Sequence, residues 1–441
     1  DIECEPSYVG VIDRLHRDYF VRPMLKPVLE AIGAPPKSLI PANRLVSPAI
    51  LRMAVSPRPS PTVPVEDFVW DAGKMHDAAS GRDMAAALEG IARYRPEPTP
   101  SQRLAIESSL SRRLSLLWGP PGTGKSATSK SILVGLLSAA RHGRPVRIAI
   151  TGPTWVAIDN IMQDVPELLA SMGLGQDVTI ARLKTPDGTL DGVPAPLREH
   201  VVETEASHER MPHLVSTLTG LERCAIIAGT ASQLARLGNI CEAARDDRGI
   251  VDFMLVDEAS QMDVAHALVA FSTLAEGASV TVVGDDLQMS PIHPVEAPEN
   301  HGYVFGSIYD FYARYRNTTP ETSPVKRAML NENFRSNSEI VGFFKHAGYK
   351  SLEASPRNAG HRARTSAPVP SGRPPDWPSA LPWSEHFATI LDPEAPLVAI
   401  IHEDRYASQR NEPEALLVAG MVHALRGRLL PIERREGRDP S

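Results

Sequence analysis

The chain has 441 residues, of which 42% are hydrophobic and 22% are charged, and its formal net charge at pH 7 is −7. A chain of this length and composition buries two or three cores, which excludes a protein that is disordered throughout. The negative charge does not point to a nucleic-acid partner. It does not exclude one either, because an acidic protein can contain a basic groove.

The three cysteines, Cys4, Cys224 and Cys241, lie far apart and form no C-x-x-C pair of the kind that binds zinc or carries redox chemistry. We therefore expect a reducing compartment, in the cytoplasm or nucleus, rather than secretion. No apolar run approaches the ~18 residues that a membrane span needs, and no signal peptide is visible. The chain begins at Asp1 rather than Met, which leaves open a preceding targeting segment.

Residues 1–96 are rich in proline and contain no motif that we can name, so we treat them as a region of unknown fold. The run from Ser56 to Pro64 has the composition of a connector. From residue 97 the pattern changes to short apolar strands that alternate with helical segments. This change predicts a first α/β domain over residues 97–328.

The strongest single motif is a phosphate-binding loop between a strand predicted at Leu114–Trp118 and a helix predicted at Ser126–Ala140. Its sequence fits G-x-x-x-x-G-K-[ST], and it consists of Gly119-Pro120-Pro121-Gly122-Thr123-Gly124-Lys125-Ser126. In such a loop the backbone amides surround the phosphates, Lys125 reaches the β- and γ-phosphates, and the Ser126 hydroxyl binds Mg²⁺. The motif predicts that the chain binds ATP or GTP.

Further strands are predicted by runs of apolar, largely β-branched residues, and their continuous apolar character indicates a parallel sheet covered on both faces. These runs are Val146–Ile150, Cys224–Ala228, Phe253–Val256 and Val280–Val283. Between them, residues 163–222 are more polar. We expect that segment to be a largely helical insertion.

Two carboxylates follow the predicted strand Phe253–Val256, at the end of a strand where phosphate chemistry takes place in such sheets. Asp257 is the expected Mg²⁺ residue, and Glu258 is the expected base that orients and deprotonates water. A lone Asp-Glu pair is more often a solvated strand end, but the phosphate loop favours the catalytic interpretation. Gln288 ends the next strand segment and is a candidate sensor of the γ-phosphate; by itself, it would more often be a loop glutamine.

A second α/β unit is predicted over residues 329–441. Its elements are a strand at Leu397–Ile401, beyond the proline-rich stretch from Ala367 to Pro382, and a helix at Pro413–Arg426.

Together, these motifs resemble superfamily 1 helicases, closest to the 5′-to-3′ branch that includes the up-frameshift RNA helicase and senataxin. The resemblance covers about residues 97–425. The ordered matches are Gln102, Gly119–Ser126, Gly152-Pro153-Thr154, Gly229-Thr230, Asp257–Gln261, Gly284–Gln288 and Leu330–Ser336. It implies two RecA-like P-loop domains with parallel sheets, the second truncated.

The resemblance also implies residue roles. Gln102 would read adenine, which makes ATP the nucleotide, and Arg335 would reach the γ-phosphate from the second domain. A surface ion pair is the alternative for Arg335. Pro153, Thr154 and Thr230 match positions that contact the sugar–phosphate backbone of a single strand of DNA or RNA. Trp155 either stacks on a base or packs, and we favour packing.

Two later motifs of this helicase branch, of the V-D-x-x-Q-G and T-R-A types, do not occur before Ser441. We therefore expect the chain to be incomplete at its C-terminus, with missing internal residues as the alternative. The cysteines are also too few for the zinc module of the up-frameshift protein, so the expected kinship is to the motor only.

The sequence thus predicts an ATP- and Mg²⁺-dependent helicase that moves along a single strand. A non-translocating ATP-binding switch that controls a partner protein is the main alternative. A P-loop kinase of small molecules is disfavoured by Gln261, Gln288 and Arg335.

Overall fold

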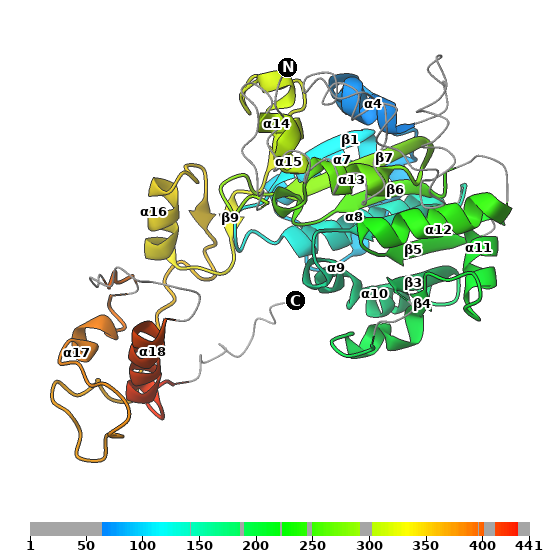
Figure 1. Cartoon of the computed structure of the whole chain (residues 1–441). Coiled ribbons are helices and arrows are strands. Elements are labelled where there is room, and N and C mark those ends of the chain that lie inside the picture. The colour runs from blue at the N-terminus through cyan, green and yellow to red at the C-terminus, as the bar shows by residue number, and fades with distance from the viewer. Residues whose placement is uncertain are drawn as a thin grey trace, which may run out of the picture. The chain divides into compact units, whose positions relative to one another are not determined.

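The computed structural model describes residues 64–141, 143–185, 189–220, 223–244, 249–291, 302–395, 397–400 and 411–430. These residues form two compact units (Figure 1). The first comprises the described parts of residues 64–120 and 124–330, and the second comprises residues 121–123 and the described residues from 331 onward. The predicted connector at Ser56–Pro64 lies outside the described residues except for Pro64.

The first unit is built on an eight-stranded parallel sheet in the order β4-β3-β5-β2-β6-β7-β1-β8 (Figure 1). This confirms the predicted α/β class with a parallel sheet. The strands are β1 (Leu114–Trp118), β2 (Arg147–Thr151), β3 (Val178–Lys184), β4 (Val201–Glu203), β5 (Cys224–Ala228), β6 (Val251–Val256), β7 (Leu274–Gly284) and β8 (Arg327–Met329).

Both faces of this sheet are buried. Successive residues of a strand point to opposite faces, so the burial of consecutive residues shows that each face is covered. Leu117, Ile148 and Leu255 belong to one large apolar cluster, and their neighbours Leu116 and Met254 are buried as well. From residue 97 onward, the α-helices described in this unit are α7 (Pro100–Ser111), α8 (Lys125–Ala140), α9 (Trp155–Met162), α10 (Val165–Ser171), α11 (Met211–Gly220), α12 (Ala231–Ala244), α13 (Val264–Phe271), α14 (Gly302–Phe305) and α15 (Ile308–Ala313).

The segment 163–222 is not the helical insertion that its composition predicted. It contains α10 and α11, but it also supplies β3 and β4, which extend the central sheet beyond β5. Its polar strand residues are paired: Arg182 binds Asp159, and Lys184 lies 3.0 Å from Glu203. Polar composition misled the prediction because these charges are neutralised by partners within the fold.

The boundary predicted at residue 97 is also wrong. Residues 64–96 form α4 (Pro64–Trp70), α5 (Ala72–Asp77) and α6 (Met84–Arg93), which belong to the first unit. The buried Phe68 ring lies 6.1 Å from that of Phe271, and Ala87 and Ile91 enter the main apolar cluster. Apolar residues on three short helices thus complete the core, although no motif marks them.

The second unit contains α16 (Ser338–His346), α17 (Phe387–Ile390), α18 (Glu412–Leu425) and a two-stranded sheet of β9 (Glu332–Asn333) and β10 (Glu353–Ala354). Its small core comprises Val369, Trp377, Phe387 and Ala424. The helix predicted at Pro413–Arg426 is confirmed as α18.

The strand predicted at Leu397–Ile401 is not formed over its described residues, 397–400, whose side chains are exposed. An apolar segment becomes a strand only beside another strand that pairs with it. The described part of this unit offers only the short β9–β10 pair. A second RecA-like parallel sheet is therefore not seen in these residues.

A buried histidine ties α5 to the sheet and makes the stability of the first unit depend on pH. His76 Nδ1 donates to Leu114 O at 3.1 Å, and Nε2 accepts from the Lys326 amide at 3.3 Å, which requires the neutral ring. Burial, followed by the charge of Arg112, lowers the pKa of His76 below its ordinary 6.5.

Because the unfolded chain protonates His76 at a higher pH than the folded chain does, the free energy of unfolding should fall as pH drops below about 6.5. Urea unfolding between pH 5 and 7.5 measures this slope. His76→Gln should flatten it, whereas His213→Gln, at an exposed position, should not. Equal slopes for His76→Gln and the unmodified protein would contradict the assignment.

Candidate active site

The chemistry-bearing segments meet at one edge of the first unit, because all strands of its parallel sheet end there. The phosphate loop follows β1, Asp257 follows β6, and Asp285 follows β7, and these three strands are neighbours. Thr154 follows β2 by three residues and Thr230 follows β5 by two, on the other side of β6. The fold thus brings together residues that lie far apart in the sequence.

The phosphate loop has the backbone conformation that its glycines predict. Gly122 and Gly124 have φ values of 78° and 80°, in the left-handed region that residues with a side chain rarely adopt. Helix α8 begins directly after Gly124, so its first amides face the loop. The Lys125 ammonium donates to Gly119 O at 3.0 Å, which folds the lysine back over the loop.

Asp257 and the partly buried Glu258 lie near Lys125. The Asp257 side chain is almost fully buried, and Glu258 Oε1 lies 3.7 Å from Lys125 Nζ. Burial, and then the charge of Glu258, raises the pKa of Asp257 to about 7, while Lys125 acts in the opposite direction. The site therefore concentrates negative charge that a cation would neutralise.

The pair also fits a metal ion. Asp257 Oδ1 and Glu258 Oε2 are buried acceptors without a hydrogen-bond partner. Within the described ranges no group of three or more His, Cys, Asp or Glu residues is arranged to hold a metal. Mg²⁺ needs no such group, since one or two carboxylates together with substrate phosphates commonly hold it. Asp257 and Ser126 are the residues that would bind it here.

Close backbone packing holds this carboxylate turn in place. The Asp257 amide donates to Thr151 O at 2.9 Å, and Glu258 is in the left-handed region at φ 48°. A Cβ on Gly152 would lie 2.8 Å from Asp257 O, so a side chain there would displace the turn. Gly152 was singled out in the sequence only as part of a motif, and its role in packing could not be inferred there.

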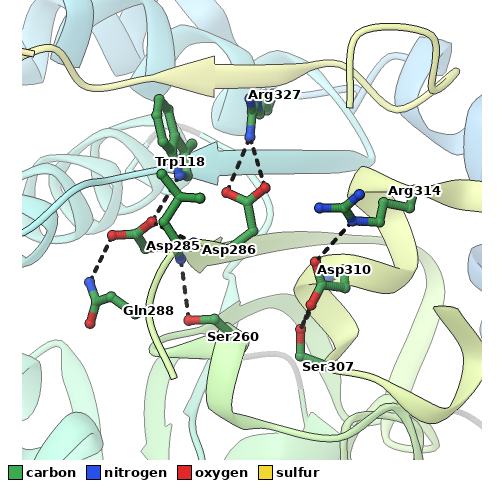
Figure 2. A network of polar contacts seen from close by, with 10 residues as sticks. Trp118, Ser260, Asp285, Asp286, Gln288, Ser307, Asp310, Arg314 and Arg327 are labelled. Carbon is green, nitrogen blue, oxygen red and sulfur yellow. Dashed lines mark hydrogen bonds and ion pairs between the residues drawn. The ribbon is translucent and has the colours of Figure 1, made fainter. Parts of the chain in front are cut away.

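Gln288 is held by its own segment. Its Nε2 donates to Asp285 Oδ2 at 2.9 Å, and the fully buried Asp285 also accepts from Trp118 Nε1 at 3.0 Å (Figure 2). Asp286 next to it binds Arg327 of β8. Sequence reasoning missed Trp118, Asp285 and Arg327, although the sequence Gly284-Asp285-Asp286 marked the segment.

Gln102 lies at the third position of α7 and completes a capping box. Its Oε1 accepts from the Thr99 amide at 3.0 Å, and the Thr99 hydroxyl accepts from the Gln102 amide. This explains locally why a glutamine occurs here. Adenine reading by Gln102 stays a prediction.

The residues expected to bind a nucleic-acid strand lie just after the ends of two neighbouring β-strands, β2 and β5. Thr154 is exposed and caps α9 by accepting from the Ala157 amide, and Thr230 Oγ1 donates to Gln233 Oε1 at 3.1 Å. Pro153 is partly buried beside Thr154.

Trp155 packs, as we favoured. The Arg182 guanidinium lies 3.7 Å from the centroid of its ring and is fixed by two hydrogen bonds of 2.8 Å to Asp159. The ring also packs against the main apolar cluster.

Arg335 belongs to the second unit and is exposed. Its neighbour Asn333 donates to Pro121 O at 2.7 Å, and the Phe334 amide donates to Gly122 O at 2.7 Å, so residues 121–123 are grouped with that unit. The reach of Arg335 to a γ-phosphate stays a prediction.

Comparison with known proteins identifies the type of domain. A family model described as an AAA domain matches residues 102–294. ATP-dependent helicase NAM7 of Saccharomyces cerevisiae is 26% identical over 207 residues, which are 44% of this chain and 20% of that protein. ATP-dependent helicase upf1 of Schizosaccharomyces pombe is 35% identical over 72 residues, 16% of this chain and 8% of that protein. Residues 102–294 therefore match the model of an AAA domain, and parts of the chain are similar in sequence to ATP-dependent helicases.

The chain also has remote neighbours among solved structures. The crystal structure of Arterivirus nonstructural protein 10 (helicase) has a TM-score of 0.31 and 14% identity, and the match covers 58% of this chain and 43% of that chain. Pif1 helicase from Candida albicans has a TM-score of 0.25 and 18% identity, over 54% of this chain and 40% of that chain. These likenesses are weak, so the assignment rests on the sequence matches.

The chain spans a fifth or less of the curated relatives named here. Across the described residues, no helix combines the length and apolar character that crossing a membrane requires.

The raised pKa of Asp257 predicts a conflict between stability and function. Because the folded pKa of Asp257 lies above the ordinary 3.8, the free energy of unfolding falls as pH rises from about 3.8 to about 7, and the loss is complete above that. Asp257→Asn should therefore increase the free energy of unfolding of the nucleotide-free protein at pH 8.5 by more than about 1 kcal/mol, and by less at pH 5, where only part of the penalty has developed.

Urea unfolding in the presence of a chelator measures this difference, and Asp191→Asn at an exposed position is the control. An equal effect of Asp257→Asn at both pH values would show that the Asp257 carboxylate is not destabilised by burial.

Proposed function

We propose that this chain is the ATPase part of a superfamily 1 helicase or translocase that hydrolyses ATP with Mg²⁺ and moves 5′ to 3′ along a single strand. The observation that carries the proposal is the convergence of Lys125, Asp257 and Glu258 at one end of a parallel sheet, with two buried carboxylate oxygens lacking partners. The homology of this domain to superfamily 1 helicases supports the same conclusion.

In this proposal each side chain has one task. Lys125 and the amides of the phosphate loop bind the β- and γ-phosphates, and Gln102 contacts adenine. Ser126 and Asp257 hold Mg²⁺, which when bound neutralises charge on the phosphates. Glu258 orients the attacking water and accepts its proton, and Gln288 and Arg335 bind the γ-phosphate.

We assign contact with the nucleic-acid strand to Pro153, Thr154 and Thr230. These residues follow β2 and β5, at the same edge of the sheet as the phosphate site. The structure of the Arterivirus helicase with DNA shows such a protein in complex with nucleic acid. A nucleotide-driven change at β6 would reach β2 directly, because these strands pair. This adjacency supports a motor whose contact with the nucleic-acid strand depends on the bound nucleotide.

Glu258→Gln and Asp257→Ala should have different effects on the ATPase reaction. Glu258→Gln should keep its affinity for Mg-ATP and lower kcat about 10²–10⁴-fold, because it removes only the base. Asp257→Ala should lose Mg²⁺-dependent affinity. Calorimetric titration and steady-state turnover separate the two, with Lys125→Ala as a binding-deficient control. Equal losses of affinity would show that the two carboxylates do not divide these tasks.

Single strands should stimulate ATP turnover, and their binding should weaken as salt rises, because phosphate contacts release counterions. Thr230→Ala should reduce the stimulation more than the basal rate, while Thr219→Ala, on α11 and away from the carboxyl ends of the β-strands, should change neither.

Tailed duplexes of DNA and RNA with 5′ or 3′ tails test substrate and direction. Unwinding only from 3′ tails would contradict the direction, and a lack of strand stimulation would favour a non-translocating ATP switch.

A further inference from the structure

The orientation of the Gln288 amide is fixed by the group that it contacts. Gln288 Nε2 donates to Asp285 Oδ2 at 2.9 Å, and a carboxylate can only accept. The amide must therefore turn its nitrogen, and not its oxygen, toward Asp285. An amide nitrogen carries two hydrogens, so one bond to Asp285 sets the direction of the second N–H.

Asp285 is itself immobilised on three sides. It is fully buried, and its Oδ1 accepts from Trp118 Nε1 at 3.0 Å and from the Leu287 amide at 3.2 Å. Its own amide donates to Ser260 Oγ at 3.3 Å (Figure 2). Asp285 is thus tied to the last residue before the phosphate loop and to the turn that follows Glu258.

Trp118 is held in turn by a cation. The Arg327 guanidinium lies 4.5 Å from the centroid of the Trp118 ring, and its Nη1 lies 3.2 Å from both carboxylate oxygens of Asp286. Both charged side chains are largely buried. The guanidinium therefore restrains the indole plane in the orientation that directs Nε1 at Asp285.

We propose that Trp118, Asp285 and Arg327 are positioning residues that hold the Gln288 amide ready for a terminal phosphate and thereby set the preference for ATP over ADP. The inference rests on the proposed function. The Gln288 N–H that is not bound to Asp285 donates to an oxygen of the γ-phosphate. ADP has no such oxygen, so the network strengthens binding of the triphosphate only.

Trp118→Phe tests the proposal, because phenylalanine keeps a smaller aromatic ring under Arg327 and lacks the indole N–H donor. Affinity for a non-hydrolysable ATP analogue with Mg²⁺ should fall about tenfold, as expected when a hydrogen bond to a charged acceptor is lost. Affinity for ADP should not change. Titration calorimetry measures both, and Trp70→Phe, at a residue 44% exposed on α4, is the matched control. A general loss of structure would lower the affinities for the ATP analogue and for ADP alike. If the ratio of these two affinities is the same in Trp118→Phe as in the unmodified protein, the proposal is wrong.

A double-mutant cycle shows whether Trp118 acts through Gln288. Gln288→Ala alone should lower the preference for the ATP analogue, and adding Trp118→Phe should then have no further effect. Additive losses would contradict the relay. If Trp118→Phe does not fold, Arg327→Lys replaces it in the cycle, since lysine keeps the charge beside Asp286 but loses the planar group over the ring.

The outcomes distinguish this inference from the proposed function. If the unmodified chain binds and hydrolyses ATP but Trp118→Phe keeps its full preference for the ATP analogue, the relay is wrong and the ATPase stands. If the unmodified chain binds neither nucleotide, both are wrong.

Discussion

The candidate site of the first unit depends on the burial of one carboxylate, Asp257, beside the partly buried Glu258 and opposite one lysine. Removing Asp257 from water disfavours its charge, and Glu258 beside it adds repulsion, so that the pKa of Asp257 rises to about 7. The Lys125 ammonium lies 3.7 Å from Glu258 Oε1 and offsets only part of this repulsion. A cation bound with a nucleotide would relieve the remainder, so the same burial that weakens the empty fold favours the binding of Mg-ATP.

The parallel sheet is what keeps these groups together. Its strands are apolar on both faces and are held by helices on each, so their carboxyl ends form a rigid edge. Loops from β1, β6 and β7 then need only a few contacts to be fixed, such as the one between the Gly119 amide and Gly284 O at 3.0 Å. Rigid positioning of this kind is what transition-state stabilisation requires.

Asp285 connects three of these loops. Through its side chain and its amide it contacts Trp118 before the phosphate loop, Ser260 after Glu258, and Gln288 in its own segment (Figure 2). A fully buried carboxylate persists only where donors surround it, so each of these loops also stabilises the others. Asp285 also connects these loops to β8, because Trp118 donates to Asp285 and packs against Arg327 of β8.

The sequence by itself determined the phosphate loop, the carboxylate turn and the parallel sheet, because strand burial and glycine-dependent turns leave local patterns. β1 and β5 begin and end at the predicted residues. Tertiary structure alone decided that β3 and β4 join the sheet and that residues 64–96 complete the core, since their charges and short helices are stabilised by partners distant in sequence. It also left residues 397–400 without the predicted strand, because a strand requires a neighbour. The relay from Trp118 to Gln288 likewise exists only in the fold, which brings together residues 170 positions apart in the sequence.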